Sequence, residues 1–394
     1  MKLRYDDDVE RFRAQFQEWL DENQPTPEEM ESAPVRSSAH RPPWAQRWAR
    51  RMFDDGWLVP GWPPELGGRN AEAVETLVYL EELYNRGIPR TTNPQGLGIV
   101  APSLIDHGRE DQIERYAMPL LRGDLTACLG MSEPDAGSDL AGLKTRAVFD
   151  GDSIVLNGQK VWTSGAHDAD FCFMFCRTDP DVPKHQGISV VLVPMDADGV
   201  TVRPLMEIVH PRFPDLNEVF LDDVTVPAEN LVGELNNGWR MANDSLAHER
   251  SLVWLMSVFG NEVALKRLLE LAPELLGDLG PLEKAGAIDD FVGLHVDVLA
   301  ARCMGYRGFA RFVKGGTAPE QALMKVYTSE ARQRLALVAA ELAGPAGLRP
   351  GSGRHTEVGT QEDFFSTFAS TISAGSSEIQ RNIIADRVLG LPRS

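Results

Sequence analysis

The segment CLGMSEPDAGSDLAGLKT, residues 128–145, stands where the chain changes from one periodicity to another. Before it, from residue 1 to about 125, apolar side chains recur at the spacing of amphipathic helices, as in the stripe Val9, Phe12, Phe16 and Leu20. After it, to about residue 235, apolar and polar side chains alternate, which is the pattern of half-buried strands. The segment itself joins a short apolar strand to a turn rich in Ser and Gly. We therefore predict a helical domain followed by a β domain.

The β domain is predicted from short alternating runs that are separated by turn residues. In SIVLNGQKVW, residues 153–162, the pair Asn157-Gly158 predicts a tight turn with positive φ and therefore a hairpin. Further strands are predicted in DFCFMFC, GISVVLVPM, GVTVRPL and NEVFLDDVTV.

The last part of the chain returns to long helical patterns that are separated by short breaks. Such an arrangement is typical of an antiparallel four-helix bundle. The predicted fold class is thus α+β, with an N-terminal all-helical domain over residues 1–125, a central β domain over 126–235 and a C-terminal four-helix bundle over 236–394.

Bulk composition limits the classes of partner and the compartment. The chain of 394 residues has a formal net charge of -19, which argues against nucleic acid or an anionic membrane as the main partner. The four cysteines show neither a bridging nor a metal-binding pattern, and the eight histidines are scattered, so no metal site is expected. The N-terminus lacks an apolar signal core. We expect a soluble, cytoplasmic protein.

Two small-residue segments are candidate ligand sites. In the first, Gly137 permits close backbone approach, while Ser132 and Ser138 offer hydroxyl and N–H groups, so this loop suits a pyrophosphate or a flavin edge. A hydrated turn explains the same residues equally well.

The second segment is TISAGSSEIQRNIIADRVLG, residues 371–390. Its small residues lead into a helix for which Ser377 and Glu378 are the predicted capped start. A helix N-terminus of this kind leaves backbone N–H groups free to face a ligand, but none of the small residues is an acid or a base.

Four stretches together resemble the acyl-CoA dehydrogenase family: MSEPDAGSDLAGLKT, NGQKVWTSGAHDADF, VPAENLVGELNNGW and ISAGSSEIQRNIIADRVLGLP. The resemblance runs in the family's order from about Gly56 to the C-terminus. It implies the same three-part fold, FAD bound without a covalent link, and oxidation of acyl-CoA thioesters to trans-2-enoyl-CoA. It also implies an electron-transfer flavoprotein as the electron acceptor.

The resemblance assigns residues of this chain to the flavin ring. Leu129, Met131 and Ser132 line the ring, with the Ser132 region near N5. Trp162 and Ser164 cover the other side of the isoalloxazine.

The remaining cofactor residues by resemblance lie in the two small-residue segments. Gly137 and Ser138 are placed near the pyrophosphate, and Ser138 also near the CoA moiety of the substrate. Ser376 and Glu378 are placed at the ribityl or adenosine portion of FAD.

The catalytic base departs from the commoner family pattern. Most members carry a glutamate where this chain has Ala374, which accepts no proton, whereas a minority carry the base on the first helix of the bundle, at the position of Glu249 here. Glu249 shares an apolar stripe with Leu246, Val253 and Met256, and a desolvated carboxylate has a raised pKa and is a stronger base once ionised. The alternative is a partly exposed glutamate paired with Arg250 or another cation.

Oxygen polarisation is assigned to the backbone of the small turn. By resemblance, the N–H of Ala374 donates to the thioester carbonyl and stabilises developing enolate charge while Glu249 removes the α-proton. Arg250 and Gly375 are assigned, with Ser138, to substrate binding.

Two further departures predict a heteromer. The Arg-x-x-Phe-Gly segment that family homotetramers extend to a neighbour's FAD is absent from KRLLELAPELLGDLGPLEKAG, and ELAGPAG differs from the glutamine-and-glycine segment at Glu341 and Pro345. This pattern resembles the actinobacterial two-plus-two heterotetramers of steroid side-chain β-oxidation, which predicts a related partner subunit and a bulky acyl group.

Two other functions compete with the dehydrogenase. A flavin monooxygenase on the same fold does not need Glu249, and a non-catalytic acyl-CoA-binding subunit would only stabilise a partner. The presence of Ser132, Trp162 and Glu249 argues against the second.

Overall fold

The computed structural model describes residues 5–209, 213–250, 253–277, 279–314, 320–348 and 361–392, without the side chains of 245–250, 253, 254, 320, 321, 361 and 362. Two compact units divide the chain. The first comprises residues 1–82, 88–207 and 211–249, and the second comprises 83–87, 208–210 and 250–394. Each unit is described by itself.

The first unit begins with the predicted helical region. Its main helices are α1 (Asp7–Asn23), α2 (Pro27–Ser32), α3 (Pro43–Asp54), α4 (Ala73–Arg86), α5 (Ala101–His107), α6 (Glu110–Gln112) and α7 (Met118–Leu121). The stripe predicted on α1 is buried at Phe12, Phe16 and Leu20. Phe16 packs on Trp57 with ring centroids 4.6 Å apart and on Tyr79 at 4.8 Å. Burial of this aromatic cluster explains why α1 folds onto the helices that follow it.

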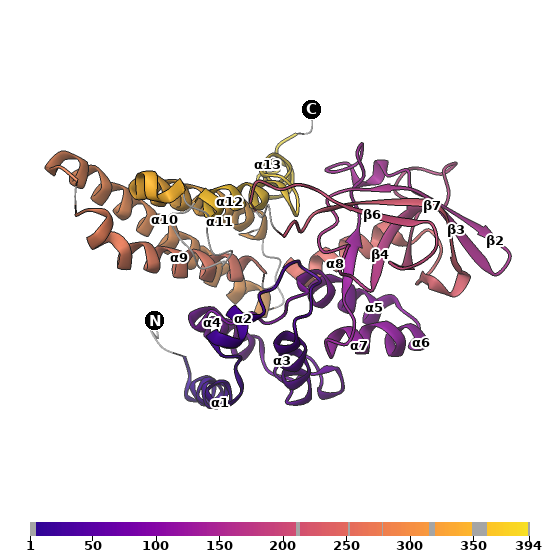
Figure 1. The fold of residues 1–394 in the computed structure, drawn as a ribbon, viewed down its shortest axis with the longest axis horizontal. Helices are drawn as coiled ribbons and strands as arrows, with labels where there is room; N and C mark the ends of the chain where they lie inside the picture. Colours follow the sequence, from indigo (N-terminus) through magenta and orange to yellow (C-terminus); the bar gives the residue numbers. More distant parts are fainter. Residues whose placement is uncertain are drawn as a thin grey trace. The chain divides into compact units, whose positions relative to one another are not determined.

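The same unit contains one mixed sheet, drawn in magenta tones in Figure 1. Its strands are β1 (Ala127–Gly130), β2 (Arg146–Asp150), β3 (Ser153–Lys160), β4 (Phe171–Arg177), β5 (Ile188–Pro194), β6 (Val200–Pro204), β7 (Asn217–Pro227) and β8 (Leu231–Val232). They pair in the order β6-β7-β3-β2-β4-β5-β8, with β1 parallel to β4. Strands β4 and β5 are buried on both faces, because the first six residues of each are all buried.

The hairpin predicted at Asn157-Gly158 is wrong. Strand β3 runs through both residues without turning, and the turn lies instead at Gly151, φ +58, between β2 and β3. Gly158 has φ +153 at an irregularity in the β3–β7 pairing, where a Cβ would lie 2.6 Å from the Thr145 hydroxyl oxygen. The glycine therefore permits the close approach of Thr145 beside a bulge, whose extra residue lies on β7, and it does not form a turn.

The second unit is built on four long helices, shown in orange to yellow in Figure 1: α9 (Val253–Leu275), α10 (Pro281–Val313), α11 (Glu320–Ala343) and α12 (Gln361–Ile372). Leu268 of α9, Leu294 of α10 and Leu335 of α11 are buried in one apolar cluster. The short helix α13 (Ser377–Ile383) packs on α11. Helix α8 (Gly238–Arg250) precedes the bundle. The predicted α+β fold class, with a helical region, a β domain and a helical bundle, is confirmed.

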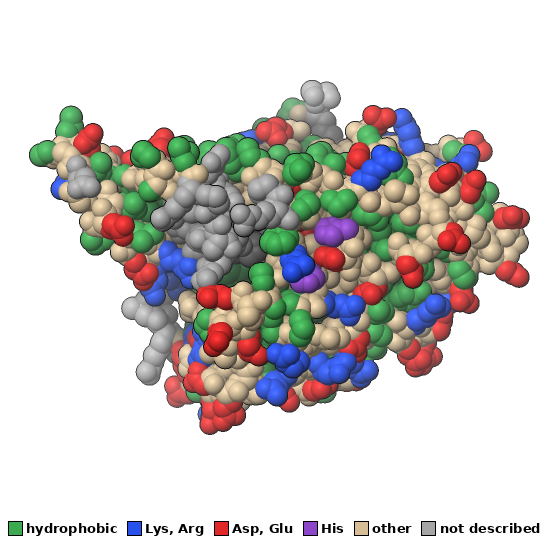
Figure 2. Space-filling model, in the orientation of Figure 1, with side chains coloured by type: hydrophobic (Ala, Val, Ile, Leu, Met, Phe, Trp, Pro, Cys, Tyr) green, Lys and Arg blue, Asp and Glu red, His purple; other side chains and the backbone are tan. Residues whose placement is uncertain are grey.

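Charges on the visible face of the molecule are mixed. Figure 2 shows acidic and basic side chains interspersed over it. Within the described ranges, no helix combines the length and the apolarity that a membrane span requires.

Candidate functional site

The loop that follows β1 is organised around the carboxylate of Glu133, which is buried. One of its oxygens, Oε1, accepts hydrogen bonds from the Thr145 N–H at 2.8 Å and from the Lys160 ammonium at 2.9 Å. The other, Oε2, accepts from the Lys144 N–H at 2.6 Å. Burial by itself would raise the pKa of Glu133, but the Lys160 charge, its hydrogen bond and the donors at Thr145 and Lys144 hold that pKa below its ordinary value. The carboxylate is therefore ionised at neutral pH.

Lys160 joins this loop to the segment after β3. Its ammonium also donates to the Met131 carbonyl at 3.1 Å, and the Val161 N–H donates to the Ser132 carbonyl at 3.0 Å. The residues predicted to line a flavin ring, Leu129, Met131 and Ser132, are half-buried beside these contacts, while Gly137 and Ser138 are exposed. The structure thus connects two of the predicted ligand segments directly.

The second of these segments presents an aromatic ring to the outside. Trp162 has a 61% exposed side chain, large for a tryptophan, and its backbone lies in the left-handed region at φ +59. Ser164, two residues on, is half-buried. Asn217, fully buried, holds the loop from behind. The side-chain amide of Asn217 donates to the Thr163 carbonyl at 3.0 Å, and the backbone carbonyl of Asn217 accepts from the Thr163 N–H at 3.0 Å.

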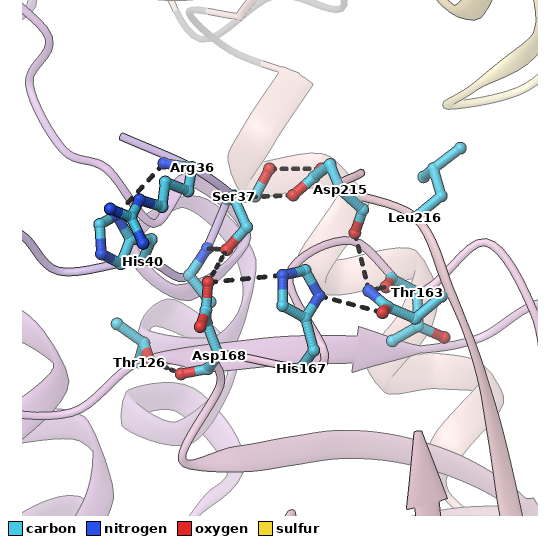
Figure 3. A network of polar contacts seen from close by, with 12 residues as sticks. Arg36, Ser37, His40, Thr126, Thr163, His167, Asp168, Asp215 and Leu216 are labelled. Carbon is cyan, nitrogen blue, oxygen red and sulfur yellow. Dashed lines mark hydrogen bonds and ion pairs between the residues drawn. The ribbon is translucent and has the colours of Figure 1, made fainter. Parts of the chain in front are cut away.

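A polar network continues from this loop to the helical part of the same unit (Figure 3). The Ser37 hydroxyl donates to Asp168 at 2.7 Å, and both the N–H and the hydroxyl of Ser38 donate to Asp215, at 2.6 and 2.7 Å. His167 lies between Asp168, 3.5 Å away, and Asn217, 3.0 Å away. Segments far apart in sequence are therefore fastened to the loop that carries Trp162.

The small-residue turn of the second unit has an unusual backbone. Ala374 and Gly375 follow each other in the left-handed region, at φ +52 and +88, in the turn between α12 and α13. The Gln380 side-chain amide donates to the Ala374 carbonyl at 3.2 Å. A non-glycine residue with positive φ is uncommon, so the turn holds Ala374 in a strained conformation.

The predicted capped start of the terminal helix is displaced by one residue. Ser376 rather than Ser377 is the N-cap, and its hydroxyl accepts from the Ile379 N–H at 3.4 Å. Ser377 is instead buried at the first helical position. Glu378 is exposed, and hydrogen bonds from its own N–H and from Ser376 lower its pKa.

The predicted base and the predicted substrate arginine are only partly described. The backbone of Glu249 and of Arg250 lies in α8, but both side chains lie outside the described residues. The predicted stripe that includes Leu246, Val253 and Met256 therefore stays a prediction.

Three residues that the sequence reasoning did not single out support the candidate site: Lys160, Glu133 and Asn217. A signal for Lys160 was present, since it falls in the alternating register of the buried Ile154 and Leu156 on β3. A lysine in an inward register needs a buried acceptor. For Asn217, at the start of β7, the sequence offers no comparable signal.

The geometry of the first unit suits a flat aromatic ligand that also takes hydrogen bonds. An exposed indole ring at Trp162 and half-buried apolar side chains at Leu129 and Met131 offer van der Waals surface, and Ser132 and Ser164 add hydroxyl groups. Flavin rings need such a combination of apolar faces and polar edges, so these residues fit the cofactor that the family motifs imply. The buried carboxylate of this loop region, Glu133, is engaged by Lys160, Thr145 and Lys144, so it is not available for proton abstraction.

Comparison with known proteins extends this likeness to the whole chain. Three acyl-CoA dehydrogenase domain profiles match it: the N-terminal domain over residues 6–124, the middle domain over 128–224 and the C-terminal domain over 236–389. The acyl-CoA dehydrogenase IpdE1 of Mycobacterium tuberculosis is 36% identical over 402 residues, with 98% of each chain covered. FadE34 of the same organism is 38% identical over 87% of this chain, which corresponds to 46% of FadE34.

Solved structures agree with the sequence matches. The steroid ACAD formed by Tcur3481 and Tcur3483 superposes with a TM-score of 0.83 at 28% identity over the whole of both chains. The ChsE4-ChsE5 complex from Mycobacterium tuberculosis superposes with a TM-score of 0.81 at 30% identity, again over both whole chains. The sequence matches and the structural superpositions thus indicate the same protein family. The chain belongs to the acyl-CoA dehydrogenase family, whose members are flavoprotein oxidoreductases.

Proposed function

We propose that this chain uses FAD to convert an acyl-CoA thioester to the trans-2-enoyl-CoA. The observation that carries the proposal is the direct connection between the loop after β1 and the loop that presents Trp162, through the Lys160 and Val161 contacts. FAD held by these loops would supply the acceptor, flavin N5, for the β-hydride of the substrate. The chain's own residues bind and orient the cofactor and the substrate, and one of them removes the α-proton of the substrate.

Within this proposal the first unit provides the surface for the isoalloxazine, with Leu129, Met131, Ser132, Trp162 and Ser164. The exposed loop at Gly137 and Ser138 is assigned to the pyrophosphate, and Ser138 also to CoA. Ser376 and Glu378 are assigned to the ribityl or adenosine portion from the family motif alone.

Proton removal is assigned to Glu249 on α8. The position at which most family members carry their base is Ala374 here, in a turn without any acidic side chain at residues 373–377. The Ala374 N–H is assigned to the thioester carbonyl, with Gly375 beside it and Arg250 next to the base. Oxygen polarisation and proton abstraction then come from two different segments of the chain.

A related subunit is proposed as the partner, in a two-plus-two heterotetramer. Helix α10 supports this because it is apolar on two faces. One face is buried in the bundle at Phe291, Leu294 and Val298. A second stripe is 50 to 58% exposed and consists of Ile288, Val292, Val296 and Leu299. At about 100° per residue the two stripes lie about 120° apart around the helix, and a second apolar stripe that the bundle does not cover marks a surface for a partner.

The partner and the substrate are both suggested by relatives. Two of the structures with which this chain superposes are the Tcur3481-Tcur3483 steroid ACAD and the ChsE4-ChsE5 complex. We extend both features to this chain: a bulky, steroid side-chain-like acyl group and a homologous second subunit. An electron-transfer flavoprotein as the acceptor and a cytoplasmic location complete the proposal.

Anaerobic titration tests the reaction. The purified protein, co-expressed with a related subunit, is expected to be yellow and to be bleached by one member of a panel of acyl-CoAs, with enoyl-CoA as the product. A preparation that cannot be reconstituted with FAD contradicts the flavoenzyme. Oxygen-dependent hydroxylation without enoyl-CoA formation supports a monooxygenase instead.

Cys303 offers a test of the partner without any substitution. It is the exposed one of the four cysteines, and it lies four residues after Leu299 in line with the exposed stripe of α10. Alkylation of Cys303 is expected to be fast in the lone chain and slow in the complex. A lone chain that forms a stable, fully active homotetramer with one FAD per subunit refutes the heteromer.

A further inference from the structure

Among the described residues outside those assigned to cofactor and substrate, the most deeply buried ion pair is that of Lys160 and Glu133. The two side chains are 0% and 6% exposed, and their N–O distance is 2.9 Å. Two other ion pairs in the same region, Lys144–Asp135 and Lys184–Asp139, have side chains that are 51 to 79% exposed. Surface pairs of that kind contribute little to stability. The buried pair differs in kind from its neighbours.

Both oxygens of the Glu133 carboxylate accept hydrogen bonds, and these bonds come from two different parts of the chain. The carboxylate binds two consecutive N–H groups, those of Lys144 and Thr145, which precede β2, and the ammonium of Lys160 at the end of β3. Lys160 in turn binds the Met131 carbonyl, which follows β1. The pair therefore links three segments of the sheet at one point.

These contacts orient one peptide group in particular. In a trans peptide the carbonyl of one residue and the N–H of the next point in opposite directions. Because Lys160 binds the Met131 carbonyl, the Ser132 N–H points away from the buried ammonium. The Val161 N–H binds the next carbonyl, that of Ser132. Two successive carbonyls of the loop, those of Met131 and Ser132, are thus each held by a hydrogen bond from residue 160 or 161.

We propose that Lys160 and Glu133 act as a positioning pair, which holds the Met131–Ser132 backbone in the orientation that a bound flavin requires. Because the two charges are opposite, the pair as a whole places no net charge near the flavin. The proposal rests on the proposed function, since it takes the flavin to lie against Ser132 and Trp162. It adds two residues that do not touch the cofactor and act through the loop.

The two members of the pair carry opposite charges, so removing either one has an opposite electrostatic effect on the flavin. Lys160→Met leaves an uncompensated carboxylate, which disfavours the electron-rich reduced flavin and lowers its two-electron potential. Glu133→Gln leaves an uncompensated ammonium and raises that potential. The double variant carrying both changes is neutral and returns the potential towards that of the wild type.

Cofactor affinity responds differently from potential. Each variant breaks the link between the loop and β3, because Met cannot donate to the Met131 carbonyl and Gln places an NH2 group against an N–H donor of the loop. FAD should therefore bind at least tenfold more weakly in all three variants. Lys184→Met, in the exposed pair of the same loop region, is the matched control and is expected to keep wild-type affinity.

The experiment uses the full-length chain in its complex, with FAD binding followed by flavin fluorescence, the visible circular dichroism of the bound flavin, and the potential measured against indicator dyes. Opposite shifts in the two single variants, with weakened FAD binding in all three, support the proposal. Equal-signed or absent shifts, or wild-type affinity in the double variant, refute it. If a single variant fails to fold, the neutral double variant decides the question through its affinity. A wild-type protein that binds no FAD contradicts the proposed function and is distinguishable from all of these results.

Discussion

Asn217 is the side chain whose removal should most directly loosen the loop that carries Trp162. It is fully buried, and its side-chain amide donates to the carbonyls of Thr163 at 3.0 Å and Asp215 at 2.8 Å. Asn217→Ala removes both bonds and also the 3.0 Å contact of the Asn217 side-chain oxygen with His167 Nδ1, and it leaves the buried Thr163 carbonyl without this donor. An unsatisfied buried acceptor costs about 1–3 kcal/mol, and the lost Asp215 and His167 contacts add about 0.5–1.5 kcal/mol each. We expect the free energy of unfolding to fall by about 2–6 kcal/mol.

Asn157 provides a matched control in the same sheet. Its side chain makes two hydrogen bonds at the surface, donating to the Asp223 carboxylate at 2.9 Å and accepting from the Asp223 N–H at 3.0 Å. Water replaces these bonds, so Asn157→Ala should cost less than about 1 kcal/mol.

Equilibrium urea unfolding of the two variants, followed by tryptophan fluorescence, measures both effects. The comparison is valid if the dependence of unfolding free energy on urea is the same in both proteins. Equal losses in Asn217→Ala and Asn157→Ala would refute the reasoning, because they would show that the loop does not depend on the buried amide.

Four further predictions follow from the same structure. Glu249→Gln should lower turnover by about 10²- to 10⁴-fold in stopped-flow assays while FAD stays bound, and adding Ala374→Glu should recover part of it; near-normal turnover in the single variant would exclude Glu249 as the base. Gly158→Ala should lower the unfolding temperature, since its Cβ would meet the Thr145 hydroxyl oxygen at 2.6 Å; an unchanged melting curve would contradict the bulge argument. Val292→Glu, in the exposed α10 stripe, should reduce copurification with the partner subunit and leave the lone chain's stability unchanged; undiminished copurification would place the interface elsewhere. The folded-state pKa of Glu133 lies below its ordinary value of 4.5, so the ionised carboxylate stabilises the fold above that pH, and this stabilisation is lost as the pH falls through the folded pKa. When the free energy of unfolding is measured as a function of pH, it should fall more steeply below about pH 4.5 in the wild type than in Glu133→Gln.

Much of the fold could be predicted from the sequence, because the period of apolar residues is a local property. The helical stripe of Phe12, Phe16 and Leu20 and the buried strands β4 and β5 each follow from spacing within a single segment. Asn157-Gly158 shows where local reasoning fails. Positive φ at a glycine is needed both in a hairpin turn and in a bulge, and only the pairing of β3 with β7 and the closeness of Thr145 distinguish the two.

The sequence by itself also determined where cofactor chemistry should be sought, since Ser132, Trp162 and Ala374 lie in motifs that are contiguous along the chain. Only the tertiary structure decided what holds those motifs in place. Lys160 meets Glu133 because β1, β2 and β3 bring residues 131, 144–145 and 160 to one point, and Asn217 reaches Thr163 from a strand more than fifty residues away along the chain. The physical reason is that a buried charge or amide needs hydrogen-bond partners, and here the pairing of strands brings those partners close. Strand pairing joins distant segments, so it cannot be predicted from any one of them.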